Sequence, residues 1–112
     1  MPRRRRPPLL LSAEFPALAA EITERLRARA EHQLAATVPG LHIIGRCRCG
    51  DDFCATMYTE PPPRGAYGSN HRSIDLDANE GLVILDVRHE RIACVEVLNR
   101  DDIRRKLLGF FP

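Results

Sequence analysis

The apolar residues between positions 12 and 36 recur every three or four residues, a spacing that places them on one side of a helix. They are Phe15, Leu18, Ile22, Leu26, Ala30 and Leu34. Ser12 is suited to cap the first turn, and Pro16 is tolerated because it lies within that turn. Val38-Pro39-Gly40 then ends the pattern. The sequence predicts one long amphipathic helix over residues 12–36.

After this helix the pattern changes to short apolar runs of the kind that form β-strands, each bounded by Gly, Pro, Asp or Asn. The runs are residues 41–49, 53–59, 72–76, 82–87 and 91–98. Short connections favour antiparallel pairing of neighbouring strands. The exception is the stretch of residues 60–71, where a proline triplet and two glycines predict a long irregular loop.

The C-terminal residues predict a short helix. Asn99 is a suitable N-cap, two acidic residues follow in the first turn, and Gly109 closes the segment. We expect Phe110 and Phe111 to pack against the body or a partner. The predicted fold class is α+β, in which the long N-terminal amphipathic helix packs on a four- to five-stranded antiparallel meander, followed by this short helix.

The charge of the chain is concentrated at its start. The formal net charge is +2 over 112 residues, and Arg3 to Arg6 supply four positive charges, so the remainder carries −2. Residues 1–11 have the Arg- and Pro-rich composition of a disordered arm, and residues 12–112 form one domain. The arm is expected to touch nucleic acid weakly, since the body does not continue a basic surface.

No apolar stretch reaches the length that a membrane-spanning helix needs. Glu14 and Pro16 interrupt the apolar segment after the basic residues before it becomes a signal sequence. We therefore expect a cytoplasmic protein.

Three of the four cysteines, Cys47, Cys49 and Cys54, fall within eight residues. If residues 50–53 form a hairpin loop, Cys49 lies opposite Cys54 and Cys47 lies on the same face, so the three sulfurs converge. Zinc takes four such ligands in a tetrahedron. The alternating pattern directs His42 to the opposite face, so a fourth ligand must come through the fold from Cys94, His71 or His89.

Two other interpretations of these cysteines stay open. Free cysteine is among the most buried residue types, which favours a role as small core residues with Arg46 and Arg48 on the wet face. A disulfide between Cys49 and Cys54 is the third alternative, which a reducing cytosol disfavours.

The remaining polar residues give no positive sign of an enzyme. His71 has Asp75 and Asp77 nearby in the sequence, but these acids alternate with apolar residues as solvent-facing strand positions do. The sequence contains no phosphate-binding glycine loop, nucleophile elbow or metalloprotease motif. An enzyme would need a site assembled by the fold, with His71 and Tyr67 as its candidates.

The last predicted hairpin, residues 82–87 and 91–98, resembles the closing hairpin of a family of very small bacterial β-meander proteins with no assigned activity. In that family the second strand reads Gly-Arg-Ile-Val-Gly-Ile-Glu-Ile-Leu, and an earlier strand follows an Asp, as residues 52–58 do here. The family lacks the long N-terminal helix and the Cys-x-Cys-Gly segment. The resemblance implies a fold and a bacterial origin only.

These observations favour a non-catalytic binding or assembly module. Both strands of the last hairpin are apolar at nearly every position, which is typical of a sheet covered on both faces. The helix covers one face, and a second copy is the simplest cover for the other, so we expect a homodimer. The alternative is a zinc-stabilised module with a regulatory or nucleic-acid-binding role.

Overall fold

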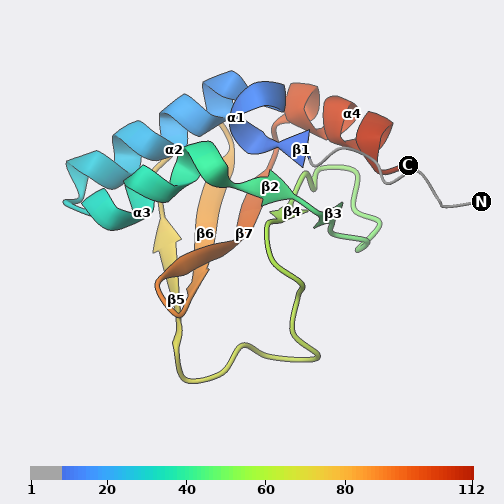
Figure 1. Cartoon of the computed structure of the whole chain (residues 1–112). Helices are drawn as coiled ribbons and strands as arrows, with labels where there is room; N and C mark the ends of the chain where they lie inside the picture. The colour runs from blue at the N-terminus through green and yellow to red at the C-terminus, as the bar shows by residue number, and fades with distance from the viewer. Residues whose placement is uncertain (1–8) are drawn as a thin grey trace, which may run out of the picture.

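The computed structural model describes residues 9–112, in which the helices gather on one side of an antiparallel sheet (Figure 1). The helices are α1 (Leu11–Glu14), α2 (Pro16–Ala28), α3 (His32–Thr37), the 3-10 turn η1 (Val38–Gly40) and α4 (Asp101–Phe110). The strands are β1 (Leu9–Leu10), β2 (His42–Ile43), β3 (Gly45–Arg46), β4 (Met57–Tyr58), β5 (His71–Asp75), β6 (Leu82–Arg88) and β7 (Arg91–Leu98). The predicted α+β fold class is confirmed.

The main sheet has five antiparallel strands in the order β3-β4-β7-β6-β5. The β6–β7 hairpin lies at its centre, with Leu85 paired with Val95 and Asp86 with Cys94. A simple meander would place β5 beside β4, but β4 pairs with β7 instead. The connection between β4 and β5, residues 59–70, therefore crosses from one side of the hairpin to the other.

The single helix predicted over residues 12–36 is broken twice. The first break is Phe15, which has a non-helical backbone (φ −129°, ψ 63°) because proline disfavours a helical conformation in the residue before it. At the second break Ala30 adopts a positive φ of 60°. There α3 folds back beside α2 (Figure 1). The apolar spacing continues through both breaks, so periodicity alone could not locate them.

The predicted disordered arm, residues 1–11, extends too far toward the C-terminus. Leu9 and Leu10 pair with Ile43 and His42 in a two-stranded sheet. Leu11 is fully buried. Residues 9–11 therefore belong to the folded domain, and the four arginines of the arm lie outside the described residues.

The core lies between the helices and one face of the sheet. Val83, Leu85 and Val87 of β6 are 0% exposed and share one apolar cluster with Ile22 and Leu26 of α2. Every second residue of β6 faces this cluster, as the pleat of a strand requires. None of the helices in residues 9–112 is long and apolar enough to cross a membrane.

The C-terminal segment packs against the body, as predicted. The Phe110 ring meets the Phe15 ring edge to face at 6.5 Å, and Phe111 packs on the core. The predicted boundaries of this helix differ in detail, because Arg100 is the N-cap residue and the helix runs through Gly109 to Phe110.

Candidate functional site

The face of the sheet opposite the helices holds a polar cleft of about 320 Å³. Asp86 of β6, together with Cys94 and Glu96 of β7, lines its floor. The loop of residues 59–70 supplies a wall through Pro62, Pro63, Gly65 and Tyr67, and Tyr58 of β4 supplies another. The cleft exists because the β4–β5 connection has to cross the hairpin.

Cys47 and Cys54 line the cleft, and their sulfurs and that of Cys49 all lie within 4.8 Å of one another. The backbone N–H of Cys47 donates to the Thr56 carbonyl at 2.9 Å, which extends the β3–β4 pairing. Gly50, with φ of 84°, reverses the chain. Cys54 then forms an isolated bridge with Leu98 of β7. A local turn therefore brings the three sulfurs together.

The exposure of the cysteines distinguishes two roles. Cys94 is 2% exposed and is a core residue. Cys47 and Cys54 are half-buried, and Cys49 is exposed. The interpretation of the cysteines as buried core residues is therefore wrong for Cys47, Cys49 and Cys54, which are free thiols that are half-buried or exposed.

The surroundings of Cys54 and Cys49 shift their thiol pKa values in opposite directions. Burial acts to raise the pKa of Cys54, but hydrogen bonds involving the Thr56 side chain and backbone, and the neighbouring thiols, hold that pKa below its usual range. A backbone hydrogen bond from Asp51 acts to lower the pKa of Cys49, whereas the Cys54 and Cys47 sulfurs raise it to about 11. Of this pair, Cys54 ionises first.

The described residues supply no fourth His, Cys, Asp or Glu ligand to the three sulfurs. His71 pairs with Asp86, and His89 lies in the β6–β7 turn with φ of 51°. His42 is exposed in β2. Cys94 lines the same cleft, but burial and the charges of Asp86 and Glu96 raise its thiol pKa well above the usual range. Among the described residues, this group of possible metal ligands is therefore limited to the three sulfurs.

A second cluster of polar groups surrounds Asp86, which is 8% exposed. His71 Nε2 lies 2.8 Å from Asp86 Oδ1, and the Ser73 hydroxyl donates to the same oxygen at 3.1 Å. The Tyr67 ring stacks on the His71 ring with centroids 4.4 Å apart and planes 13° from parallel. The loop is thereby anchored to the edge strand β5.

Glu96 completes this second cluster. Burial, followed by the hydrogen bond and the charge of Asp86, raises the pKa of Glu96 to about 7, against an opposing effect of His71. Burial likewise raises the pKa values of Tyr58 and Tyr67 to about 12 each. At neutral pH both phenols are protonated, and Glu96 keeps its proton to a higher pH than an ordinary carboxyl group does.

The sequence indicated His71 and Tyr67 as candidate site residues but did not identify the carboxylate that pairs with His71. Asp75 is exposed, as expected for a solvent-facing strand residue. The partner is Asp86, which the β5–β6 register places opposite Ser73. The available signal was a single acid inside each of two apolar strands, Asp86 in β6 and Glu96 in β7.

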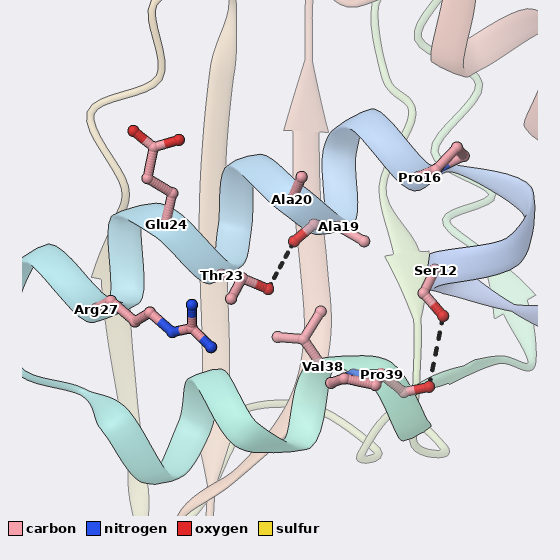
Figure 2. A pocket seen from close by; sticks show the side chains of 9 residues that line it. All are labelled: Ser12, Pro16, Ala19, Ala20, Thr23, Glu24, Arg27, Val38 and Pro39. Carbon is pink, nitrogen blue, oxygen red and sulfur yellow. Dashed lines mark hydrogen bonds between the residues drawn. The ribbon is translucent and has the colours of Figure 1, made fainter.

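A larger hollow of about 550 Å³ lies on the outside of the helix layer, between α2 and η1 (Figure 2). The hydroxyls at its edge are satisfied by nearby backbone, since Ser12 donates to the Pro39 carbonyl at 3.4 Å and Thr23 donates to the Ala19 carbonyl at 2.8 Å. Glu24 is its one acid. This hollow gathers no group of reactive side chains, unlike the cleft on the sheet.

Several arginines outside the arm bind groups of the protein itself. Arg46 donates to the Phe111 carbonyl, and Arg48 donates to a Pro112 oxygen at 2.8 Å. Arg72 bridges Glu31 and Glu90. These three side chains are therefore engaged within the domain.

No family model, no curated protein and no solved structure matches this chain. The likeness to small bacterial β-meander proteins stays a prediction.

Proposed function

We propose that this protein is a small non-catalytic zinc-binding module, in which the thiolates of Cys47, Cys49 and Cys54 hold the metal. The observation that carries the proposal is the convergence of the three sulfurs within 4.8 Å. Zinc–sulfur bonds of about 2.3 Å in a tetrahedron separate the sulfurs by about 3.8 Å. Small side-chain rotations close the remaining difference.

Zinc fits this donor set better than the hard cations do. Thiolates select soft or borderline metals, whereas magnesium and calcium prefer oxygen ligands. Three protein sulfurs satisfy three of the four positions that zinc prefers, and water or an added ligand fills the fourth. Binding displaces the thiol protons, so zinc overrides the difference in pKa between Cys49 and Cys54.

The metal would stabilise a turn that has few backbone contacts of its own. Between Cys47 and Cys54, the Cys54 N–H donates to the Asp51 carbonyl at 3.3 Å. Cys54 is also the point at which the turn meets β7, through its bridge with Leu98. A zinc ion on the three sulfurs therefore fastens the turn to the central hairpin.

The proposal is tested by metal analysis of the full chain, produced without a histidine tag and purified under reducing conditions. After loading with zinc and desalting, we expect about one zinc per chain. Replacing zinc with Co²⁺ should give sulfur-to-cobalt charge-transfer absorption. Less than a tenth of an equivalent of zinc on folded, reduced protein would overturn the proposal.

Cysteine variants identify the ligands. Cys49→Ser changes an exposed side chain and should abolish stoichiometric zinc without unfolding the domain. Cys94→Ala is the matched control, because Cys94 is the fourth cysteine and lies outside the sulfur cluster. It should keep its zinc. Retention of zinc by Cys49→Ser, or its loss from folded Cys94→Ala, would contradict the assignment.

We also propose that the protein forms a homodimer, and two exposed large apolar side chains support this. Ile44 is 50% exposed and Phe53 is 44% exposed. Ile44 directly precedes β3, an edge strand of the sheet whose outer side can pair with another strand. We expect a dimer by light scattering at micromolar concentration that dissociates when Ile44 is replaced by Lys. A monomeric full chain would contradict this.

Weak nucleic-acid contact through Arg3 to Arg6 also stays a prediction. Contacts with phosphate should weaken steeply with salt, because they depend on counterion release. Any low-salt RNA binding by the full chain should disappear when residues 2–8 are deleted. Salt-resistant binding that survives the deletion would contradict it.

A further inference from the structure

The cleft on the sheet has walls and a floor of different chemistry. Tyr58 and Tyr67 contribute rings to its walls, and Pro62 and Pro63 add apolar surface beside them. The floor contains the carboxyl groups of Asp86 and Glu96. A volume of about 320 Å³ is at the lower end of the range for small-molecule pockets.

The charge of this cleft is unbalanced. None of the residues that line it is a lysine or an arginine. The His71 imidazole lies behind the floor and contacts Asp86 Oδ1 from the β5 side. Two acids therefore face one histidine, and the Tyr67 ring covers that histidine from the loop.

We infer that this cleft binds a small organic cation, a primary ammonium or amidinium group on a compact apolar body, with the charged group on Asp86 and Glu96 and the body against Tyr58 and Tyr67. A tyrosine face attracts a cation through the quadrupole of its ring. A carboxylate accepts charge-assisted hydrogen bonds from nitrogen donors. The two tyrosines and the two acids of the cleft thus suit the same ligand.

The state of the floor supports this inference. Asp86 is nine-tenths buried, and its contacts with His71 and Ser73 hold it in place, so it is pre-organised for a ligand. Burial, and then the hydrogen bond and charge of Asp86, raise the pKa of Glu96 to about 7. A cationic ligand relieves the same repulsion between the two acids that a proton on Glu96 relieves.

The distribution of tyrosines gives a direct readout. The chain contains two tyrosines and no tryptophan, and both tyrosines line the cleft. Tyrosine emission from the full chain therefore reports on this site. The probe is cyclohexylamine, which does not absorb where tyrosine does, with cyclohexanol and cyclohexanecarboxylate as neutral and anionic isosteres.

At about pH 8, where Glu96 is largely ionised, we expect saturable changes in emission with cyclohexylamine and binding about tenfold weaker or less with cyclohexanol. Cyclohexanecarboxylate should not bind. Equal responses to the amine and the alcohol would show an apolar hollow rather than a cation site and would overturn the inference, as would no response to any of the three.

Variants of Asp86 and Glu96 test whether these two acids bind the charged group of the amine. Glu96→Gln, which leaves the Asp86–His71 pair intact, should weaken cyclohexylamine binding by about tenfold, and Asp86→Asn with Glu96→Gln should abolish it. Glu24→Gln on the exposed side of α2 is the matched carboxylate control and should bind as the unchanged protein does. Thermal unfolding confirms that each variant is folded. Undiminished binding by Glu96→Gln would contradict the site.

The amine site uses residues other than the proposed zinc ligands, but Cys47 and Cys54 line the same cleft, so the experiment has to distinguish the two proposals. The titration is repeated on zinc-loaded protein and on protein treated with a chelator. Binding of cyclohexylamine to both forms would support the cation site, whether or not zinc binds. Amine binding that occurs only with zinc, and survives the double variant, would place the amine on the metal and overturn the inference.

Discussion

The two faces of the central hairpin differ although the same strands make both. On the helix side, Val83, Leu85 and Val87 are fully buried. On the other side, the alternate residues of β6 include half-buried Leu82 and the acid Asp86, which forms a hydrogen bond with His71. Neighbouring residues of one strand thus serve separate tasks, because the pleat directs them to opposite faces. One face stabilises the fold, and the other gathers polar side chains and thiols.

The polar face remains compatible with folding because its buried group is hydrogen-bonded. Asp86 accepts a hydrogen bond from Ser73 and pairs with His71. An unpaired carboxylate at this depth would cost several kcal/mol. The long loop, which the crossing from β4 to β5 requires, shields this pair through Tyr67.

The largest expected effect is a difference in stability loss between two leucine-to-alanine variants of β6, one on each face of the sheet. Leu85→Ala removes a fully buried side chain from the helix face and should lower the free energy of unfolding by about 3 kcal/mol. Leu82→Ala removes a half-buried side chain from the other face and should lower it by about 1 kcal/mol. Denaturant unfolding measures both. Equal losses would mean that the second face is as well packed as the first.

The next effect concerns zinc on the polar face. If the three sulfurs bind zinc, free zinc at about a hundred times its dissociation constant should stabilise the protein by about 2.7 kcal/mol. For a domain of this size that is a rise in Tm of about 10 °C. Thermal unfolding with zinc and with chelator measures it. Cys49→Ser should show no rise, and a rise equal to that of the unchanged protein would point to zinc bound elsewhere.

A smaller effect is expected from pH. The pKa of Glu96 is about 7 in the folded protein and about 4.5 when unperturbed, so folding disfavours its ionised form. Its contribution to stability is fully present below about pH 4.5 and is lost as the pH rises through 7. Glu96→Gln cannot ionise. It should match the unchanged protein near pH 4 and be more stable by about 1 kcal/mol near pH 8, since partial exposure screens the effect.

Denaturant unfolding across this pH range measures the difference between the two proteins. Both proteins share every other titrating group, so the difference reports on Glu96 and its interaction with Asp86. A difference that is constant with pH would show that Glu96 has an ordinary pKa and that the acidic floor is solvated.

Local contacts account for the parts of the site that the sequence predicts. The convergence of Cys47, Cys49 and Cys54 depends on one turn within eight residues, and spacing on a hairpin is enough to foresee it. The β6–β7 hairpin is equally local. The expected break at Val38-Pro39 also holds, because α3 gives way there to the 3-10 turn η1.

The polar cluster could not be foreseen because it depends on register between distant strands. Asp86 meets His71 only when β5 lies on β6, and Tyr67 reaches them only because β4 pairs with β7 and the loop must cross. The apolar run of the hairpin instead suggested a face covered by a second copy. The positive φ of Ala30 is likewise unforeseen, since alanine favours helix. Local backbone hydrogen bonds close this turn, from the Ala30 N–H to the Arg27 carbonyl and from the Glu31 N–H to the Leu26 carbonyl.

The central claim is that three thiolates bind zinc on the sheet face opposite the core. X-ray absorption at the zinc edge, measured on the zinc-loaded full chain, tests this claim most directly. The account predicts three sulfur atoms at about 2.3 Å and one lighter atom, oxygen or nitrogen, at about 2.0 Å. The sulfur count should fall to two in any Cys49→Ser protein that retains metal. A shell of four sulfurs, or a shell of nitrogen and oxygen alone, would contradict the three-thiolate site.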